Sequence, residues 1–127
     1  MAYPAEFKYT KEHEWIKVDG NVGTIGITDH AQQALGDIVF VELPKPGSAL
    51  TAGKSFGTVE SVKAVSDLFA PVSGTVTEVN QELSTAPEKV NSEPHKAWMI
   101  KVTLSDANEV NGLLSAADYE KFVAEES

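Results

Sequence analysis

Hydrophobic and polar residues alternate in short runs from His13 to Leu104, and glycine or proline turns separate these runs. The Asp19-Gly20-Asn21 sequence between the first two runs is typical of a hairpin turn. The runs that predict strands are 14–18, 22–27, 38–41, 56–59, 72–79 and 98–104. Many short strands separated by such turns predict an all-β sandwich or barrel.

One of these runs, Ile38-Val39-Phe40-Val41, contains no polar residue. A continuous β-branched and aromatic run predicts a strand that is covered on both of its faces. The Pro44-Lys45-Pro46-Gly47 segment ends the strand, because proline cannot donate to a strand ladder and glycine permits the turn.

Two segments have helical character. Thr28 can cap a short helix that continues to Leu35, and Gly36 follows at the position where a positive φ costs least. Near the C-terminus, Ser115 and Asp118 resemble a capping box. Apolar residues then recur at about helical spacing, at positions 114, 119, 122 and 123. We therefore expect a C-terminal helical end over about residues 106–127, docked on a β body.

The chain also contains a weak internal repeat. Residues 36–43 and 74–80 both run from a glycine into a β segment, and residues 57–62 and 98–103 follow as closing strands. Residues 84–96, which include two prolines, would be an insertion in the second half. The length of 127 residues fits a single domain, residues 1–127, and the repeat predicts that it is made of two half-sheets that fold against each other.

Composition narrows the function. The 127 residues include 19 acidic residues against 10 lysines and no arginine, so the formal net charge is −9. Nucleic acids and anionic membranes are bound by clustered cations, so neither partner is expected. The chain has no cysteine, which excludes disulfides, zinc-thiolate sites, iron–sulfur ligation and a cysteine nucleophile.

No apolar run has the length of a membrane span, and residues 1–11 lack the apolar centre of a signal peptide. The expected location is the bacterial cytoplasm, with a mature mitochondrial matrix protein as the alternative. No metal site is expected either, because His13, His30 and His95 do not form a pair with ligand spacing.

Lys63 is the candidate for chemistry. A strand rises to it, and a second run descends to Gly74, so the segment from about 57 to 70 predicts a hairpin with Lys63 at its tip. A lysine in a turn is ordinarily only a solvated charge. Here the two repeated halves meet around it, and its small neighbours Ser61 and Ala64 leave it accessible to a modifying enzyme. Acylation of such a lysine replaces its charge with a long neutral tether.

The sequence resembles the glycine cleavage system H protein family of lipoyl carriers. The runs that carry the resemblance are spread over nearly the whole chain in the family's order: 13–15 (His-Glu-Trp), 26–32, 35–44, 60–64 (Glu-Ser-Val-Lys-Ala), 71–74 and 98–101. The resemblance implies a barrel-sandwich hybrid of the biotinyl/lipoyl-carrier type. It further implies that lipoic acid is attached to Lys63, with Glu60, Ser61, Val62 and Ala64 as the flanks that the modifying enzyme meets.

The function implied is that of a carrier and not of an enzyme. In this family the lipoyl group accepts an aminomethyl group from the pyridoxal-phosphate-dependent glycine decarboxylase (P protein) and presents it to the tetrahydrofolate-dependent aminomethyltransferase (T protein). Dihydrolipoyl dehydrogenase (L protein) then reoxidises it. A lipoylating enzyme is a further implied partner, and the carrier is expected to be a monomer.

The resemblance also implies a cleft that shelters the loaded arm. Glu14 and Asp67 match the family positions whose carboxylates receive the cationic aminomethyl nitrogen. Without the resemblance, we would interpret Glu14 as an exposed strand residue and Asp67 as a turn or cap carboxylate. Glu12 and Ala34 depart from some family members, so the detailed lining of the cleft stays open.

Two functions other than that of a lipoyl carrier remain open. A biotin carboxyl carrier shares the fold, but that family typically flanks its lysine with methionines, where this chain has Val62 and Ala64. The lipoyl domains of 2-oxo-acid dehydrogenases usually carry Asp-Lys-Ala and lack the His-Glu-Trp run. The other alternative is a small free-standing enzyme with an acidic cleft. The mass of the group attached to Lys63 separates the lipoyl and biotin carriers.

Overall fold

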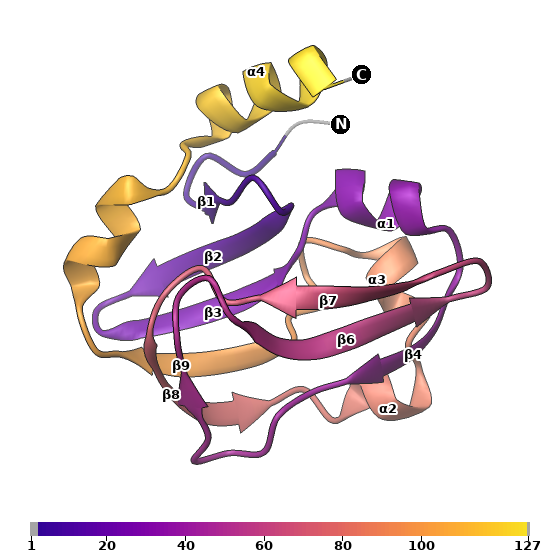
Figure 1. The fold of residues 1–127 in the computed structure, drawn as a ribbon, viewed down its shortest axis with the longest axis horizontal. Coiled ribbons are helices and arrows are strands. Elements are labelled where there is room, and N and C mark those ends of the chain that lie inside the picture. Colours follow the sequence, from indigo (N-terminus) through magenta and orange to yellow (C-terminus); the bar gives the residue numbers. More distant parts are fainter. Residues whose placement is uncertain (1–2, 127) are drawn as a thin grey trace.

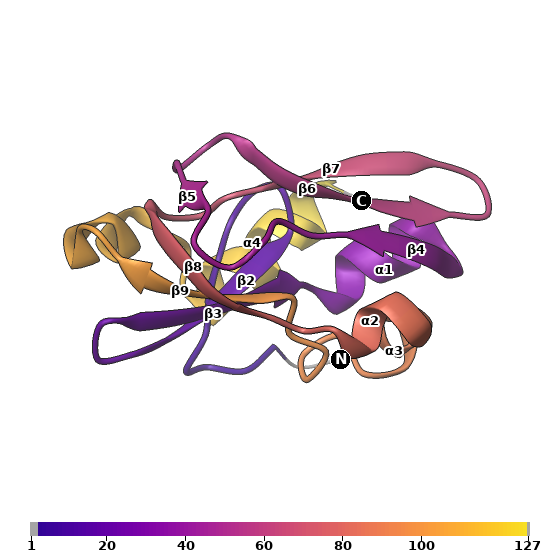
Figure 2. The ribbon, with the colours of Figure 1, turned by 90° about the horizontal axis from the view of Figure 1, so that it is seen from below.

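Two antiparallel sheets form the body of the protein in the computed structural model, which describes residues 3–126. The larger sheet has the order β1-β2-β3-β9-β8-β5, and the smaller has the order β4-β6-β7. Figures 1 and 2 show the two sheets as layers. The strands are β1 (Lys8–Tyr9), β2 (Glu14–Asp19), β3 (Val22–Ile27), β4 (Ile38–Glu42), β5 (Ala49–Leu50), β6 (Ser55–Ser61), β7 (Val65–Phe69), β8 (Gly74–Val79) and β9 (Ile100–Leu104). This arrangement confirms the predicted all-β class with two half-sheets.

The core lies between the two sheets. One cluster of buried aliphatic side chains belongs mostly to the larger sheet and includes Ile16, Ile25 and Val102. A second cluster joins the smaller sheet to the helices and includes Val59, Leu68 and Met99, all at most 2% exposed. Burial of these side chains is the main source of stability, because apolar burial is worth roughly 25 cal/mol per Å².

The internal repeat corresponds to two strand pairs. In the smaller sheet β4 pairs with β6, and in the larger sheet β8 pairs with β9. The repeated segments therefore occupy similar places in separate sheets. Strand β6 also forms a hairpin with β7. The tip of this hairpin projects at one end of the molecule (Figure 1).

Helix α1 (Asp29–Leu35) has the predicted caps. The Ala31 backbone N–H donates to Thr28 Oγ1 over 3.2 Å, and Gly36 follows with φ of 81° and ψ of −158°. This conformation is essentially restricted to glycine. The caps therefore place the end of α1 and the start of β4 at a fixed backbone position.

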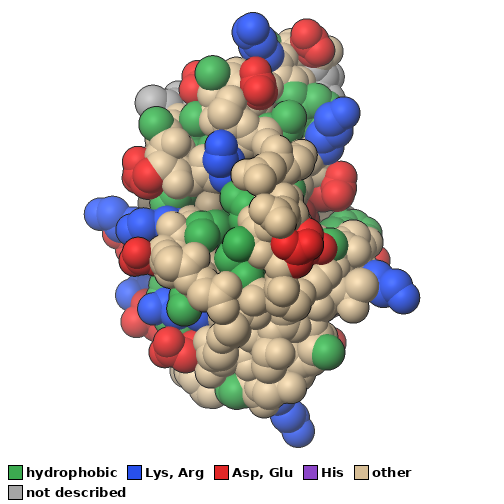
Figure 3. Space-filling model, turned by 90° about the vertical axis from the view of Figure 1, so that its left-hand side faces the viewer, with side chains coloured by type: hydrophobic (Ala, Val, Ile, Leu, Met, Phe, Trp, Pro, Cys, Tyr) green, Lys and Arg blue, Asp and Glu red, His purple; other side chains and the backbone are tan. Residues whose placement is uncertain are grey.

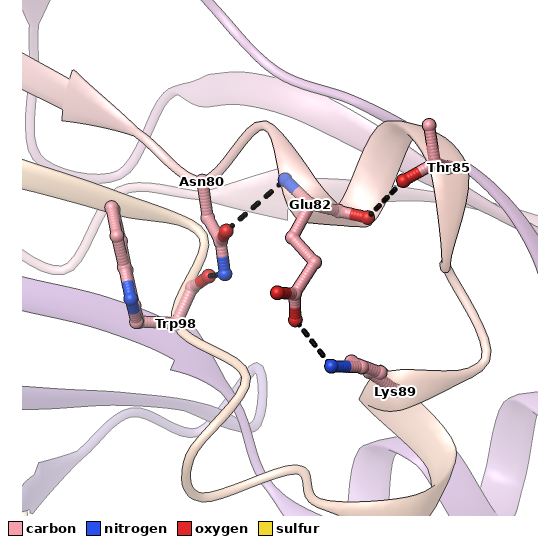
Figure 4. A network of polar contacts seen from close by, with 5 residues as sticks. All are labelled: Asn80, Glu82, Thr85, Lys89 and Trp98. Atoms are coloured by element: carbon pink, nitrogen blue, oxygen red, sulfur yellow. Dashed lines mark hydrogen bonds and ion pairs between the residues drawn. The ribbon is translucent and has the colours of Figure 1, made fainter.

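The predicted insertion at 84–96 is structured. Helices α2 (Glu82–Thr85) and α3 (Lys89–Ser92) bury Leu83 and Val90 in the second core cluster. Figure 4 shows how polar contacts hold the pair: Lys89 Nζ lies 2.6 Å from Glu82 Oε1, and Asn80 Nδ2 donates to the Trp98 carbonyl over 2.7 Å. This segment thus covers one end of the core.

The C-terminal helix is also confirmed, preceded by the 3₁₀ turn η1 (Ala107–Gly112). Ser115 Oγ accepts from the Asp118 backbone N–H over 3.2 Å at the start of α4 (Ala116–Glu126). This helix packs beside the N-terminal segment (Figure 1) and closes an aromatic cluster. The buried members of that cluster are Phe7, Tyr9, Trp15, Ala116 and Tyr119.

The expectation that residues 38–41 are covered on both faces is wrong. Ile38 and Val41 are buried, but Val39 is 53% exposed and Phe40 is 46% exposed. The pairing of β4 with β6 shifts between Ile38 and Phe40, so a bulge turns two successive side chains outward. The smaller sheet thus has one core face and one open face, unlike the parallel sheets for which continuous apolar runs are typical.

Candidate functional site

Lys63 lies in the turn that joins β6 to β7, and its side chain is exposed. Ser61, which is 9% exposed, fixes this turn. Its backbone N–H donates to the Ala64 carbonyl over 2.8 Å, and its Oγ accepts from the N–H groups of Lys63 and Ala64 over 3.3 and 3.1 Å. The turn therefore holds the backbone of Lys63 in place while its side chain is exposed.

A second support lies under the turn. The Val62 backbone N–H donates to the Asp37 carbonyl over 3.1 Å, which ties the tip to the loop between α1 and β4. Asn91, in α3, holds that loop from the other side. Its Nδ2 donates to the Gly36 carbonyl over 2.9 Å, and its Oδ1 accepts from the Ile38 N–H over 2.8 Å. The tip thus rests on a loop that is itself hydrogen-bonded to the helical segment.

Gly36 gives the stem of Lys63 room to lie on that loop. A Cβ atom placed on Gly36 would lie 3.4 Å from Lys63 Cε and 4.0 Å from Nζ. The φ of 81° favours glycine here, and an added Cβ would come into ordinary van der Waals contact with the lysine stem.

Glu14 is buried, with only 2% of its surface exposed, so the interpretation as an exposed strand residue does not hold. Thr10 Oγ1 donates to Oε1 over 2.7 Å, and the Phe69 backbone N–H donates to Oε2 over 3.3 Å. Burial raises the pKa of Glu14 from 4.5 to about 7, against the two hydrogen bonds, which favour the ionised form. Glu12 adds a smaller repulsion in the same direction as burial. The carboxyl group therefore titrates close to neutral pH.

Asp67 is exposed on β7, opposite Thr58 on β6. The Ser55 hydroxyl lies 3.4 Å from its Oδ1, a long contact for an O–H donor. Glu14 contacts β7 at Phe69, which is two residues beyond Asp67 on the same strand. Because two residues of a strand span about 7 Å, Asp67 and the Glu14 contact are separated by about 7 Å along β7. Glu14 is thus buried and hydrogen-bonded to β7, whereas Asp67 lies exposed on that strand.

The structure places Lys63 and Asp67 on one hairpin, and Glu14, on β2 of the larger sheet, reaches that hairpin through its hydrogen bond with Phe69. Lys63 is at its tip, and Asp67 and the contact with Glu14 lie on β7 as that strand leaves the tip. The strand from Val65 to Phe69 covers roughly 13 Å. The flanking residues Glu60, Val62 and Ala64 are exposed around Lys63, and Ser61 points inward.

A surface pocket of about 300 Å³ adjoins the Glu14 end of this arrangement. Thr10, the hydrogen-bond partner of Glu14, lines it, as do Glu12 and Pro71. Lys63, Glu14, Asp67 and Ala34 are not among its lining residues. Ala34 is instead exposed on α1.

Three supporting residues escaped the sequence analysis in this role: Thr10, Gly36 as the floor under Lys63, and Asn91. The Thr10 contact depends on the turn before β2, where His13 has a φ of 70° and its N–H donates to the Thr10 carbonyl. Asn91 donates a hydrogen bond to the carbonyl of Gly36, which lies 55 residues earlier in the chain. Local pattern could not reveal either contact.

Within residues 3–126, no group of three or more histidine or acidic side chains is placed to hold a metal ion. His13 and His30 do meet, with ring centroids 4.4 Å apart, and His13 Nδ1 lies 2.7 Å from the Tyr119 hydroxyl. His95 is remote from this pair in sequence, and burial lowers its pKa. No helix in the described part of the chain is long and apolar enough to cross a membrane.

Comparison with known proteins gives a consistent result. The profile of the family described as "Glycine cleavage H-protein" matches residues 7–126. Glycine cleavage system H proteins from Koribacter versatilis and Acidobacterium capsulatum are 72% and 65% identical over 127 residues, covering 100% of this chain and 98% of each relative. The one from Staphylococcus epidermidis strain RP62A is 56% identical over 126 residues, 98% of this chain and 100% of that relative.

A solved structure is similar over nearly the whole chain. The crystal structure of a glycine cleavage system H protein from Mycobacterium marinum superposes with a TM-score of 0.86 at 38% sequence identity. The match covers 98% of each chain. It confirms the predicted barrel-sandwich hybrid fold.

Proposed function

The chain belongs to the glycine cleavage H-protein family and has the lipoyl shuttle role of that family, and from this premise we propose that Lys63 is the residue that carries the lipoyl group. The whole chain then acts as one carrier domain. It is a component of a multienzyme system, with lipoic acid as its covalent cofactor. A biotin-carrier role is not favoured by the comparisons.

The exposed position of Lys63 is the observation that supports this proposal. Its side chain is exposed, while Ser61 and the Asp37 carbonyl hold the neighbouring backbone. A modifying enzyme thus meets a fixed turn with one mobile side chain. Lys54, which directly precedes β6, is also exposed, but it lies at the opposite end of that strand from the turn.

The surroundings of Lys63 fit a lipoyl arm. When bound, the lipoyl group supplies two sulfur atoms that carry an aminomethyl group from P protein to T protein and that L protein reoxidises. The chain itself has no cysteine, so this sulfur chemistry depends on the attached group. The lysine stem lies against Gly36, which has no side chain, and β7 leads from the tip to the contact with Glu14.

Glu14 and Asp67 then receive the cationic nitrogen of the cargo. Thr10 and the Phe69 N–H orient the Glu14 carboxylate and stabilise its charge in a buried position. A cation beside Glu14 lowers its pKa from about 7, so binding of the cargo at neutral pH is coupled to loss of a proton from the carboxyl group. Asp67 supplies a second, mobile carboxylate.

The partners that we propose are P protein, T protein, L protein and the lipoylating enzyme, met in turn by a monomer in the bacterial cytoplasm. The net charge of −9 suits brief, electrostatically steered encounters with each of them. Such contacts form quickly and weaken as salt concentration rises.

Lys63→Arg tests the carrier role. The variant keeps the positive charge but cannot be acylated in the same way, so we expect glycine cleavage in a reconstituted system to be abolished. Lys54→Arg, a change of the same kind at the other end of β6, is the matched control and should keep full activity. Cleavage that persists in Lys63→Arg, with the fold intact by circular dichroism, would remove Lys63 from the mechanism.

Glu14→Ala tests the cleft. We expect the variant to be lipoylated at the normal rate and to hold the aminomethyl cargo for a shorter time, as measured by release of formaldehyde and ammonia. Because Glu14 is buried, Glu14→Gln is the second variant, since an amide can still accept from the Phe69 N–H. An unchanged lifetime in both variants would exclude Glu14 from the site.

A further inference from the structure

The loop between α1 and β4 meets the β6–β7 turn residue by residue. The stem of Lys63 lies against Gly36, since a Cβ atom placed on that glycine would be 3.4 Å from Lys63 Cε. The next loop residue, Asp37, accepts a hydrogen bond at its carbonyl from the Val62 N–H over 3.1 Å. We call residues 36–38 the seat of the turn.

The last residue of the seat begins β4. Ile38 is buried and pairs with Ser61, the residue whose hydrogen bonds shape the turn. Seat and turn therefore meet at three successive positions, with their chains running in opposite directions. A shift of the seat would change the direction in which the Lys63 side chain leaves the molecule.

The side chain of Asn91 holds both ends of the seat. Its Nδ2 donates to the Gly36 carbonyl over 2.9 Å, and its Oδ1 accepts from the Ile38 N–H over 2.8 Å. Because a carbonyl can only accept and an N–H can only donate, these two partners fix the orientation of the amide. Nδ2 also donates to Gln32 Oε1 over 2.9 Å. Asn91 thus bridges the end of α1 and the start of β4.

Asn91 itself stands on a buried base. Val90, its neighbour in α3, is fully buried in the second core cluster. Lys89, also in α3, pairs with Glu82 of α2 (Figure 4). In Figure 2 the two short helices lie beside α1, at the end of the molecule that carries the hairpin tip. The segment predicted as an insertion, residues 84–96, therefore braces the seat.

Exposure by itself does not distinguish Lys63 from other lysines. Figure 3 shows the end of the molecule opposite the hairpin tip, where several lysine side chains also stand out from the surface. An enzyme that draws a lysine into its active site must order both the side chain and the backbone that carries it. A turn that is already held in place requires less ordering. The seat gives Lys63 this advantage.

We propose that Asn91 is a positioning residue for the acylation of Lys63, because it holds the seat and the seat holds the turn in the orientation that the lipoylating enzyme binds. The proposal rests on the proposed function of Lys63. In the step served, the deprotonated Lys63 amine attacks the carbonyl of an adenylate-activated lipoyl group. An amide N–C bond forms, the acyl–phosphate C–O bond breaks, AMP leaves with the electron pair, and the amine's second proton passes to solvent.

The test variant is Asn91→Asp. An aspartate keeps the shape of the side chain and an oxygen that can accept from the Ile38 N–H, but it can no longer donate to the Gly36 carbonyl when ionised. The variant therefore loosens one end of the seat without opening a cavity.

Asn80→Asp is the matched control. Asn80 is half-buried like Asn91, donates to the Trp98 carbonyl over 2.7 Å and accepts from the Glu82 N–H over 3.2 Å (Figure 4). Both variants add one negative charge and remove a hydrogen bond donated to a backbone carbonyl. The partners of Asn80 lie outside the seat, so this variant measures the general cost of such a change.

The experiment uses the full chain, purified unacylated, and has two readouts. NMR measures the rate of amide hydrogen exchange at Val62, whose N–H is bonded to the seat. Intact mass measures lipoylation over a range of carrier concentrations with lipoylating enzyme, lipoate and ATP. Thermal unfolding reports the overall stability of each variant.

We expect the Val62 amide to exchange about tenfold faster in Asn91→Asp than in the wild type, which corresponds to about 1.4 kcal/mol. The kcat/KM for lipoylation should fall about fivefold, chiefly through a higher KM, because fewer molecules hold the turn in the orientation that the enzyme binds. Asn80→Asp should resemble the wild type in both readouts, even where it unfolds at a lower temperature.

Equal exchange and equal lipoylation in the two aspartate variants would overturn the proposal. Faster exchange at Val62 with lipoylation at the rate of the control would also overturn it, because Asn91 would then have a purely structural role. If Asn91→Asp does not fold, the uncharged pair Asn91→Ala and Asn80→Ala is compared by the same two readouts.

These outcomes stay separate from failure of the proposed function. If the wild type gains no lipoyl mass at Lys63, the attachment site itself is wrong. If the wild type is lipoylated at Lys63 and both variants react equally fast, only the role of Asn91 is wrong.

Discussion

The β6–β7 hairpin and the aromatic cluster under α4 are opposites in construction. At the hairpin, the backbone is fixed by hydrogen bonds while Val62 and Lys63 are exposed. In the aromatic cluster, by contrast, contacts between side chains fix the structure. The rings of Tyr9 and Tyr119 stack with centroids 4.7 Å apart and are fully buried, and the Tyr119 hydroxyl lies 2.7 Å from both His13 Nδ1 and Thr28 Oγ1.

The difference shows how stability and function are divided. The cluster joins the two ends of the described chain to α1 and contributes apolar burial. The hairpin contributes little burial at its tip but presents one lysine in a defined place. Changes in the cluster should therefore alter the free energy of unfolding, whereas changes at the hairpin should alter acylation and retention of cargo.

Tyr119→Ala should have the largest effect on stability. It removes a buried ring and the hydroxyl contacts to His13 and Thr28, so we expect a loss of roughly 3–5 kcal/mol in the free energy of unfolding. Urea denaturation measures this loss. Below the unfolding transition, lipoylation of Lys63 should proceed at the wild-type rate. A variant that stays folded and is lipoylated much more slowly would break the proposed division between the two regions.

Glu14→Gln should change the pH dependence of stability. The pKa of Glu14 is about 7 in the folded protein and 4.5 ordinarily, so the folded state favours the protonated form. The wild type should therefore lose stability as pH rises from about 4.5 to about 7, by an amount on the order of 3 kcal/mol from this one group.

The glutamine variant lacks this titration. The difference in unfolding free energy between Glu14→Gln and the wild type should grow in favour of the variant across that pH range. Parallel stability curves between pH 4 and 8 would mean that Glu14 ionises as an ordinary exposed carboxyl group.

Gly36→Ala should affect both stability and chemistry. A side chain at φ of 81° is strained by about 1–3 kcal/mol, and relief of that strain would shift the loop that the Lys63 stem contacts. Gly53, with φ of 82° and nothing within 4 Å of an added Cβ, is the matched control. We expect Gly53→Ala to be destabilised to a similar degree but lipoylated normally, while Gly36→Ala is lipoylated more slowly. Equal lipoylation rates would show that the floor under Lys63 is irrelevant to acylation.

Asp67→Asn should have the smallest effect on folding, within about 0.5 kcal/mol, because the residue is exposed and its contact with Ser55 is long. Its effect should appear in a shorter lifetime of the aminomethyl cargo, measured as in the Glu14 experiment. A stable variant with an unchanged lifetime would leave Glu14 as the single carboxylate of the cleft.

Local patterns predicted much of the fold. Thr28 and Gly36 cap α1, and Ser115 begins the last helix, because these residues satisfy backbone groups within a few positions of themselves. The same reasoning failed for Val39 and Phe40, where a bulge and an uncovered sheet face decide exposure. Apolar residues alone cannot show whether a second layer covers them.

In the candidate site, too, some features follow from the local sequence and others depend on the folded chain. Lys63 could be placed at a turn from the strands on either side of it, and family resemblance drew attention to Glu14 and Asp67. The burial of Glu14, its bond to Thr10 and the support from Asn91 depend on chain segments that meet only in the folded protein. Their energetic consequences, such as the raised pKa of Glu14, could not be obtained from sequence spacing.

The most direct test of the central claim is peptide mapping by mass spectrometry of the full chain after co-expression with a lipoylating enzyme. We expect one lipoyl group per chain, attached to the peptide that contains Lys63, and no lipoyl mass at Lys54 or the other lysines. A lipoyl group on a different lysine, a biotin-sized addition at Lys63, or an unmodified chain would contradict it.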